Sequence, residues 1–399
     1  MTLFLVAQFV LAPFIFWLFV LFLVGLLPTR PEKGTCEKKL RFAILCCARN
    51  EERVIANLIR SLKEQDYPEE NRQIFVIAHH CTDGTAAAAQ AAGAIVWELV
   101  QADKRCKGDA LRYGISRILA ERRDDFDAFC VFDADNTAEP DFLEIMNDQL
   151  QQPHVDGAIG MRKSVNPHES FVSEMLAVHW FVMSRMYHLP RVRLGLSCVI
   201  QGTGFCVKAT CLDPDGWQTS ALTEDFEFTV RKVLTGHRFV HVPDAVFYDE
   251  QPVEWNTWLS QMYRWMFGAK QCTGLIPSIL CRLFVSPLRC WDLLWNTCLV
   301  GVCALSALAT TIALTMALIS ACENGTRMVI GVVVIMVAAL TFVLLMAALS
   351  TRMCGGRLRR YARGILCYPL FTMSGPLLFL LALTRRHCVW RSVLHKGKS

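Results

Sequence analysis

The stretch FDADN (132–136) places two carboxylates, Asp133 and Asp135, at the end of an apolar run. Side chains two residues apart on a strand point to the same face, so both can reach one ligand. Carboxylate oxygens suit Mg²⁺ or Mn²⁺, which commonly bridge one or two carboxylates to substrate phosphates. An acidic turn that caps a helix over TAEPDFLEIM (137–146) explains the same residues, so both interpretations stay open.

Three more polar clusters carry Glu51, Asp83 and Lys107 in the stretches ARNEE, HHCTDGT and KRCKGDAL. The first two directly follow apolar runs, and the third opens a helical pattern. Each offers a hydrogen-bonding group suited to a base or a ribose. Each also has a plain structural explanation, namely a helix N-cap, an Asp-Gly turn and a solvated loop charge.

The stretch LTEDFEF (222–228) supplies Glu224 and Asp225 in front of an apolar-periodic run. Thr223 fits the N-cap of that helix, and an acid here can serve as a general base if the fold brings it to the metal site. Upstream, the glycines of QGTGF (201–205) permit a close approach of backbone and ligand, or they form a tight hairpin.

The stretch QMYRW (261–265) sets Gln261, Arg264 and Trp265 directly before the most apolar part of the chain. Arg, Trp and Tyr are typical of the boundary between lipid and water, so an interfacial anchor explains the pattern. An arginine beside an indole can equally close a site for a charged substrate, because its fork of donors matches phosphate oxygens.

The elements that must position these residues alternate between strands and helices. Apolar strands are expected at 42–48, 74–80, 94–99 and 128–135, with helical periodicity at 53–65 and 109–123. This alternation predicts an α/β fold with a mostly parallel sheet. Ligands of such sheets bind beyond the carboxyl ends of the strands, where the polar clusters lie.

The N-terminal stretch 3–27 carries no charge and is long enough to cross a hydrocarbon layer of roughly 30 Å. A signal peptide is the alternative, but no basic region precedes the stretch and no small-residue cleavage site follows it. We therefore expect a retained anchor. Basic residues follow it, including Arg30, Lys33 and Arg41, which predicts that the N-terminus lies outside and the next domain is cytoplasmic.

The C-terminal part holds three further apolar runs, at 291–320, 328–349 and 364–384. The first two read as a hairpin that faces outside, and basic residues follow at 352–363. A full crossing of the third run leaves a basic tail outside, whereas a re-entrant or broken helix returns it to the cytosol. The length of this run favours a full crossing. The predicted blocks are 1–30 (anchor), 40–250 (soluble domain), 251–290 (interfacial helices) and 291–399 (transmembrane block).

The net charge of +5 is too small for a nucleic-acid surface, and we expect no nucleic-acid partner. The 18 cysteines are scattered and form no C-x-x-C pair, so in a cytosolic domain they are expected to be reduced. His79, His80 and Cys81 are consecutive, with no second ligand cluster at zinc spacing, so the sequence does not favour a zinc site.

The motifs follow one another as Asn-Glu, Thr-Asp, Lys-Gly, Asp-x-Asp, Gly-Thr-Gly, Thr-Glu-Asp and Gln-x-x-Arg-Trp. In this order, over roughly residues 40–270, the chain resembles the membrane-bound family-2 glycosyltransferases. This group includes cellulose, chitin, hyaluronan and poly-N-acetylglucosamine synthases. Two departures are the missing proline ahead of Asn-Glu and the missing second acid after Thr-Asp. Four candidate spans are few for a polymer exporter.

The resemblance implies a GT-A fold, a nucleotide-binding α/β domain inserted between transmembrane helices. It implies an inverting transfer from a UDP-sugar, UDP-glucose or UDP-N-acetylglucosamine, with Mg²⁺ or Mn²⁺ as cofactor. By similarity, Asp225 is the general base beside Glu224, and Asp135 binds the metal with Asp133. The implied donor-binding residues are Glu51, Asp83, Lys107, Asp133, Gln261, Arg264 and Trp265.

The resemblance leaves the acceptor open between a growing glycan, as in a processive polysaccharide synthase, and a lipid that receives one or a few sugars. The expected partners are the lipid bilayer, the nucleotide sugar and this acceptor, and an oligomer is not excluded. The expected location is a bacterial plasma membrane. A receptor or transporter is the alternative of another class, but transporters keep ionisable residues inside their spans, and here the spans hold almost none.

Overall fold

The computed structural model describes residues 2–28, 36–100, 106–212, 216–320, 323–386 and 388. Expectations about Arg30, Lys33, the turn at 321–322 and nearly all of the basic tail lie outside the described residues. The chain divides into two compact units, which we describe separately. The helical unit comprises Met1–Leu27, Asn166–Pro190 and Pro252–Trp390, and the sheet unit comprises Pro28–Val165, Arg191–Gln251 and Arg391–Ser399.

The sheet unit is built on one mixed sheet, in which the described residues form eight strands in the order β3-β2-β1-β4-β7-β6-β8-β5. The pairs β1–β2, β2–β3, β1–β4 and β6–β8 are parallel, and β7 runs antiparallel to both of its neighbours. The strands are β1 (Phe42–Ala48), β2 (Arg72–His79), β3 (Ile95–Leu99), β4 (Ala128–Asp133), β5 (Thr137–Ala138), β6 (Gly157–Ser164), β7 (Phe205–Lys208) and β8 (Phe239–Asp249).

The parallel strands predicted from sequence are confirmed, with ends that shift by at most two residues. Helices pack against the sheet and connect its strands. They are α2 (Ile55–Lys63), α3 (Thr85–Ala91), α4 (Lys107–Glu121), α5 (Phe142–Leu150) and α8 (Glu224–Leu234), with short 3₁₀ turns η1 (Glu69–Asn71), η2 (Arg123–Asp125) and η4 (Ala209–Cys211).

The central strand β1 is covered on both faces, which explains its unbroken apolar sequence. Ile44 and Cys46 point towards the core formed with α2 and α5, since alternate strand residues share a face. Leu45 points the other way, towards α4. A Cβ on Gly114 of α4 would lie 2.9 Å from Leu45 and from Ile77, so only glycine lets α4 approach the sheet this closely.

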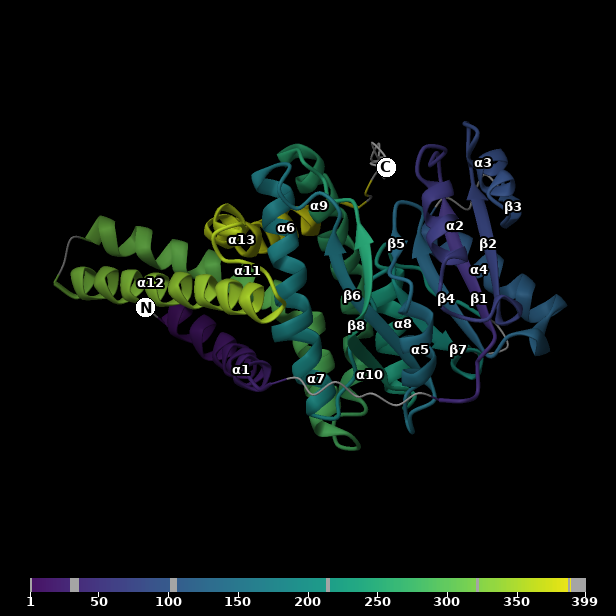
Figure 1. The fold of residues 1–399 in the computed structure, drawn as a ribbon. Helices are drawn as coiled ribbons and strands as arrows, with labels where there is room; N and C mark the ends of the chain where they lie inside the picture. Colours follow the sequence, from purple (N-terminus) through teal and green to yellow (C-terminus); the bar gives the residue numbers. More distant parts are fainter. Residues whose placement is uncertain are drawn as a thin grey trace. The chain divides into compact units, whose positions relative to one another are not determined.

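The helical unit contains α1 (Thr2–Gly25), α6 (Phe171–Val182), the π-helix η3 (Met183–His188), which leads into α7 (Leu189–Arg193), α9 (Trp255–Cys272), η5 (Thr273–Leu275), α10 (Ile276–Leu280), α11 (Pro287–Ser320), α12 (Glu323–Met353) and α13 (Ala362–Thr384). Figure 1 shows α11 and α12 alongside each other. Segment 166–190 falls inside the predicted 40–250 block, yet it packs in this unit.

Among the described residues, four helices are long and apolar enough to cross a membrane: Gln8–Gly25, Pro287–Ile312, Val329–Met353 and Ala362–Thr384. Polar contacts join the first to the second. The indole N–H of Trp17 donates to Asp292 at 2.9 Å, and the indole N–H of Trp295 donates to the carbonyl of Phe14 at 2.9 Å. Because each polar group finds its partner inside the unit, the pair can lie in an apolar medium.

Candidate active site

The carboxyl ends of β2, β1 and β4 lie at one edge of the sheet, because these neighbouring strands are parallel (Figure 1). The loops that leave this edge carry Glu51, Asp83 and the Asp133–Asp135 pair. Asp133 closes β4 beside Cys47 of β1. The strand register therefore places the loops that carry these acids at one edge of the sheet, and their role in a site stays a prediction.

The loops after β1 and β2 are fastened to each other. The side-chain oxygen of Asn50 accepts the N–H of Thr82 at 2.8 Å, and the N–H of Glu51 donates to the Thr85 hydroxyl at 2.8 Å. Asn50 and His80 both have positive φ angles, 59° and 49°. Backbone strain of this kind is uncommon outside glycine and clusters at functional sites.

Asp83 stabilises the loop that follows β2 by hydrogen bonds. Its carboxylate accepts the N–H of Thr85 at 3.1 Å and the N–H of Glu52 at 3.3 Å. Burial alone would raise the pKa of Asp83, but the hydrogen bond from the Thr85 hydroxyl, together with these two N–H groups, outweighs it and lowers the pKa below its ordinary value. Asp83 is therefore a charged acceptor at the mouth of the edge.

Lys107, the first residue of α4, lies beside Asp133. Its ammonium group forms an ion pair with Asp133 and donates to the carbonyl of Gly202 at 2.6 Å. Burial would lower the pKa of Lys107, but the carboxylates of Asp133 and Glu224 outweigh it and raise the pKa. The lysine thus joins the end of β4 to the glycine-containing loop before β7.

That loop is held from a second direction by Arg162 of β6. The guanidinium donates to the carbonyl of Gln201 at 2.6 Å and to Asp249 at 3.2 Å. Gly204 has a φ of +63°, and a Cβ there would lie 2.1 Å from the ring of Phe247. The glycine is required both by its backbone conformation and by the ring packed against it.

Asp249 is a site residue that the sequence analysis missed. It ends β8, and its carboxylate accepts the side-chain amides of Asn136 and Gln251, each at 3.0 Å. The signal was present, because the apolar run VPDAVFYDE (242–250) ends on acids just as FDAD does. Its partners come from distant parts of the chain, which the sequence pattern alone does not pair.

Asp135 lies against Asp249. Burial raises the pKa of Asp135 well above its usual range, and the neighbouring carboxylates of Asp249 and Asp133 raise it further. Such a cluster of like charges calls for a proton or a cation. No group of three or more His, Cys, Asp or Glu side chains is arranged to hold a metal ion within the described part of the chain. Two carboxylates fit a divalent ion that takes its other ligands from phosphates and water.

Asp225, the second residue of α8, lies near Lys107. A Cβ built on Gly202 would lie 3.5 Å from a carboxylate oxygen of Asp225 and 3.8 Å from the Lys107 nitrogen. Burial raises the pKa of Asp225, and the Phe226 N–H together with the charges of Lys107 and Arg162 offsets part of this rise. A buried acid with a raised pKa beside a loop glycine has the properties of a general base.

Glu224 faces in another direction from Asp225. A Cβ on Gly108, in the first turn of α4, would lie 3.2 Å from the Cβ of Glu224. The glutamate is buried, with 8% of its surface exposed. Its charge raises the pKa of Lys107.

Gln261, Arg264 and Trp265 lie on α9 of the helical unit. The Trp265 ring stands edge-on to Trp180 of α6, with centroids 6.4 Å apart. Their approach to the acids of the sheet unit stays a prediction.

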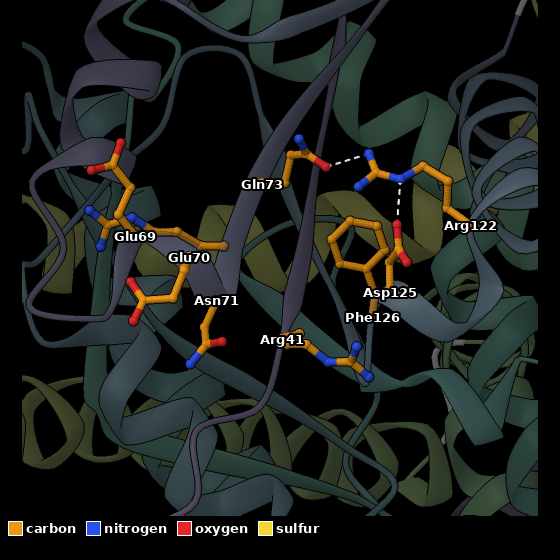
Figure 2. Close-up of a pocket in the computed structure, with 9 residues that line it drawn as sticks. Arg41, Glu69, Glu70, Asn71, Gln73, Arg122, Asp125 and Phe126 are labelled. Carbon is orange, nitrogen blue, oxygen red and sulfur yellow. Dashed lines mark hydrogen bonds and ion pairs between the residues drawn. The ribbon is translucent and has the colours of Figure 1, made fainter.

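A polar hollow of about 380 Å³ lies at the opposite edge of the sheet, next to the amino ends of β1 and β2 (Figure 2). Its arginines already have partners inside the protein. Arg122 donates to Asp125 and Gln73, and Arg41 forms a two-point ion pair with Asp127. We therefore assign the hollow to the packing of the sheet and the active site to the carboxylate edge.

The fold and the carboxylate edge together define a nucleotide-binding α/β enzyme of the GT-A type. Residues 40–268 match the family model described as "Glycosyltransferase like family 2". The chain belongs to this family.

Curated relatives agree with this assignment. The probable glycosyltransferase YdaM of Bacillus subtilis is 25% identical over 243 residues, which cover 57% of this chain and 55% of YdaM. The beta-monoglucosyldiacylglycerol synthase of Nostoc sp. is 28% identical over 197 residues, 47% of this chain and 40% of that protein. The chain thus spans about half, or less, of the length of these relatives.

A solved structure shares the fold. The mannosyltransferase PcManGT from Pyrobaculum calidifontis, in complex with GDP-Man and Mn²⁺, superimposes with a TM-score of 0.60 at 15% identity. The alignment covers 92% of this chain and 99% of PcManGT.

Proposed function

We propose that this enzyme transfers a sugar from a nucleotide-diphosphate sugar to an acceptor hydroxyl at a membrane surface, with inversion at the anomeric carbon. The observation that carries the proposal is the position of Asp225. It lies beside Gly202 and Lys107, and Lys107 in turn binds Asp133 at the carboxylate edge. Lys107 thus lies between the proposed base, Asp225, and the proposed phosphate-binding edge at Asp133.

The donor site is proposed at the loops that follow β1, β2 and β4. Asp83 and Glu51 suit a nucleobase and ribose, because both carboxylates accept N–H and O–H donors. Asp135 and Asp133 would hold Mg²⁺ or Mn²⁺ on the diphosphate, with Asp249 beside Asp135. Such an ion neutralises charge on a leaving diphosphate. The printed GDP-Man and Mn²⁺ of PcManGT support this class of ligand, and we propose UDP-glucose or UDP-N-acetylglucosamine as donor.

In the proposed reaction, Asp225 accepts the proton of the acceptor hydroxyl as its oxygen forms the new bond to the anomeric carbon. The bond between that carbon and the diphosphate oxygen breaks on the opposite side, and the diphosphate leaves with the electron pair. A base opposite the leaving group inverts the configuration, as in inverting glycosidases. Lys107 contributes positive charge near the departing group.

The pattern Gln261, Arg264 and Trp265 is proposed to close this site from α9. An arginine fork binds phosphate oxygens, and an indole face stacks on a sugar ring. The Trp180–Trp265 pair supports the second role, because it holds the indole in a fixed orientation.

Two acceptors are in competition. The Gln-x-x-Arg-Trp pattern favours a growing β-linked glycan, as in the synthases that the sequence resembles. The similarity to beta-monoglucosyldiacylglycerol synthase favours a membrane lipid. The four candidate spans found within the described residues are also simpler to reconcile with a lipid acceptor than with export of a polymer.

The test uses purified full-length chain and a panel of UDP-sugars with GDP-mannose, each with Mg²⁺ or Mn²⁺. Release of the free nucleoside diphosphate is measured. We expect release with one donor, a metal requirement, and loss of release in Asp135→Asn and Asp225→Asn. Asp244→Asn is the matched control, because Asp244 is an exposed acid of β8. Activity of all three variants at the wild-type level would contradict the proposal.

The product distinguishes the acceptors. With a radiolabelled donor, label in a long, glycosidase-sensitive product identifies a polysaccharide synthase. Label on a single sugar in the organic phase of a lipid extract identifies a lipid acceptor.

A further inference from the structure

The C-terminal helix α13 has one exposed apolar face along its whole length. Leu366, Leu370, Met373, Leu377 and Leu381 follow one another at helical spacing and are 69%, 47%, 60%, 63% and 47% exposed. The other face, with Gly364, Tyr368, Gly375, Phe379 and Ala382, is buried in the helical unit. By sequence this helix fits either a membrane crossing or a broken helix that returns.

The beginning of α13 is capped by a buried acid of α6. Glu174, only 1% exposed, accepts the N–H of Gly364 at 2.8 Å and pairs with Arg363 at 3.2 Å. A Cβ on Gly364 would lie 2.6 Å from the Glu174 carbonyl, so the two helices touch through backbone. The carboxylate satisfies the open N–H groups and the positive end of the helix dipole.

The end of α13 is capped by a lysine of α9. The Lys270 ammonium donates to the carbonyls of Ala382 at 3.0 Å and Arg385 at 2.7 Å. A cation at this position satisfies open carbonyls and the negative end of the dipole. Both ends of α13 are therefore held by charged residues of α6 and α9.

Between its ends, α13 packs against the same two helices and also against α11 and α12. Its Phe371 ring lies 4.0 Å from the His179 ring of α6 and 6.0 Å from the Trp258 ring of α9, centroid to centroid. From Trp258 to Lys270 α9 rises about 18 Å, and from Phe371 to Ala382 α13 rises about 17 Å. The second half of α13 and α9 thus run side by side in the same direction.

Chain connectivity keeps α6 and α9 on the same side of the bilayer as the sheet unit. The helical stretch Phe171–Arg193 leaves β6 and returns to β7 of the same sheet, so it does not cross a bilayer. Helix α9 follows β8 closely and carries Asn256, Gln261, Arg264 and Lys270, which are costly at hydrocarbon depth. Because α13 contacts both α6 and α9 along its length, we expect it to lie at the same depth in the membrane as these two helices.

We propose that α13 lies in the lipid interface, on the membrane face that carries the sheet unit, and does not cross. Its apolar face then rests on the acyl chains of that leaflet, as in amphipathic interfacial helices. The crossings are α1, α11 and α12. The basic tail after α13 returns to the side of the sheet unit, in agreement with the positive-inside rule. This inference does not depend on the donor or acceptor.

The first test locates three epitopes by protease digestion of right-side-out and inside-out vesicles. One epitope follows Ser399, one is inserted at the exposed turn at His154 of the sheet unit, and one between Ser320 and Glu323. The proposal expects the first two on the same side and the third on the other. An epitope after Ser399 that is cleaved together with the Ser320–Glu323 epitope overturns it.

The second test places a lysine in the middle of α13. Met373→Lys is expected to change the yield of membrane-inserted protein by no more than about twofold, because an interfacial lysine reaches water. Val337→Lys in the middle of α12 is the matched control and is expected to lose about tenfold or more. If Met373→Lys loses about tenfold or more of its membrane-inserted protein, as Val337→Lys is expected to do, the proposal is overturned.

Discussion

Replacing Asp225 by asparagine removes the proposed base and little else. The side chain keeps its shape, and the asparagine oxygen can still accept the Phe226 N–H that Asp225 accepts at 2.8 Å. The helix α8 therefore keeps its first turn. What is lost is one negative charge beside Lys107 and Arg162, and the ability to take a proton.

The expected loss follows from that role. A positioned general base contributes about 10² to 10⁴ in rate. At 1.36 kcal/mol per factor of ten, this corresponds to about 3 to 5 kcal/mol of transition-state stabilisation. We expect kcat to fall by this amount, with a small change in the KM for the donor, because the proposed partner of Asp225 is the acceptor hydroxyl and not the nucleotide.

The free energy of unfolding of Asp225→Asn, unlike its rate, should not fall. Burial raises the pKa of Asp225 in the folded chain above its unfolded value. The stability contributed by such a group is present below the unfolded pKa and is lost as the pH rises through the folded pKa. Asparagine does not titrate, so at neutral pH the free energy of unfolding of Asp225→Asn should equal or exceed that of the wild type.

The assay combines nucleotide release from pH 5 to 9 with thermal unfolding. Wild-type kcat/KM should rise with pH through the raised pKa of Asp225, and the variant should lack this rise. Two results would refute the reasoning. One is a variant that keeps more than a tenth of the wild-type rate, and the other is a rate loss that accompanies a lower melting temperature.

Three further outcomes are expected. Asp249→Asn should raise the Mg²⁺ or Mn²⁺ concentration for half-maximal activity by about tenfold, because it removes a carboxylate that faces Asp135; an unchanged metal titration would exclude this role. Chelation with EDTA should abolish nucleotide release, and Mn²⁺ should restore it; full activity in EDTA would contradict the metal site. Gly204→Ala should lower the melting temperature far more than Gly195→Ala. Both glycines have a positive φ, but only at Gly204 would a Cβ meet a ring, that of Phe247, at 2.1 Å. Equal melting temperatures for the two variants would show that this contact does not matter.

The sheet could be predicted where local pattern decides the structure. The strand Phe42–Ala48 is apolar at every position because both of its faces are covered, and the acids that follow such strands mark the functional edge. The helix over Ile55–Lys63 buries residues at spacings of three and four, which the sequence shows directly.

Non-local pairing could not be predicted. Asp249 meets Asn136 across 113 positions, because the short strand β5 directly after Asn136 pairs antiparallel with β8 and sets Thr137 opposite Tyr248. The segment that contains α6 reads as part of the soluble domain, but its apolar residues pack in the helical unit. No periodicity in a single stretch reports which distant partner will cover it.

Lys107 illustrates the limit for single residues. Its place at a helix start predicts a position near the nucleobase, which stays a prediction, and the fold adds contacts to Asp133 and the Gly202 carbonyl. Only the three-dimensional path of the Gly-Thr-Gly loop supplies that second partner.

The helical unit is assembled from three separate stretches of the chain, and this has a consequence for biosynthesis. Val172, Met175 and Leu176 emerge from the ribosome long before Met346 and Tyr368, which belong to the same buried cluster. Until the last helices are made, the apolar face of this segment stays uncovered in the newly synthesised protein. Membrane lipid, or a chaperone, must shield this surface during translation, and a truncated product that stops after Gln251 should precipitate.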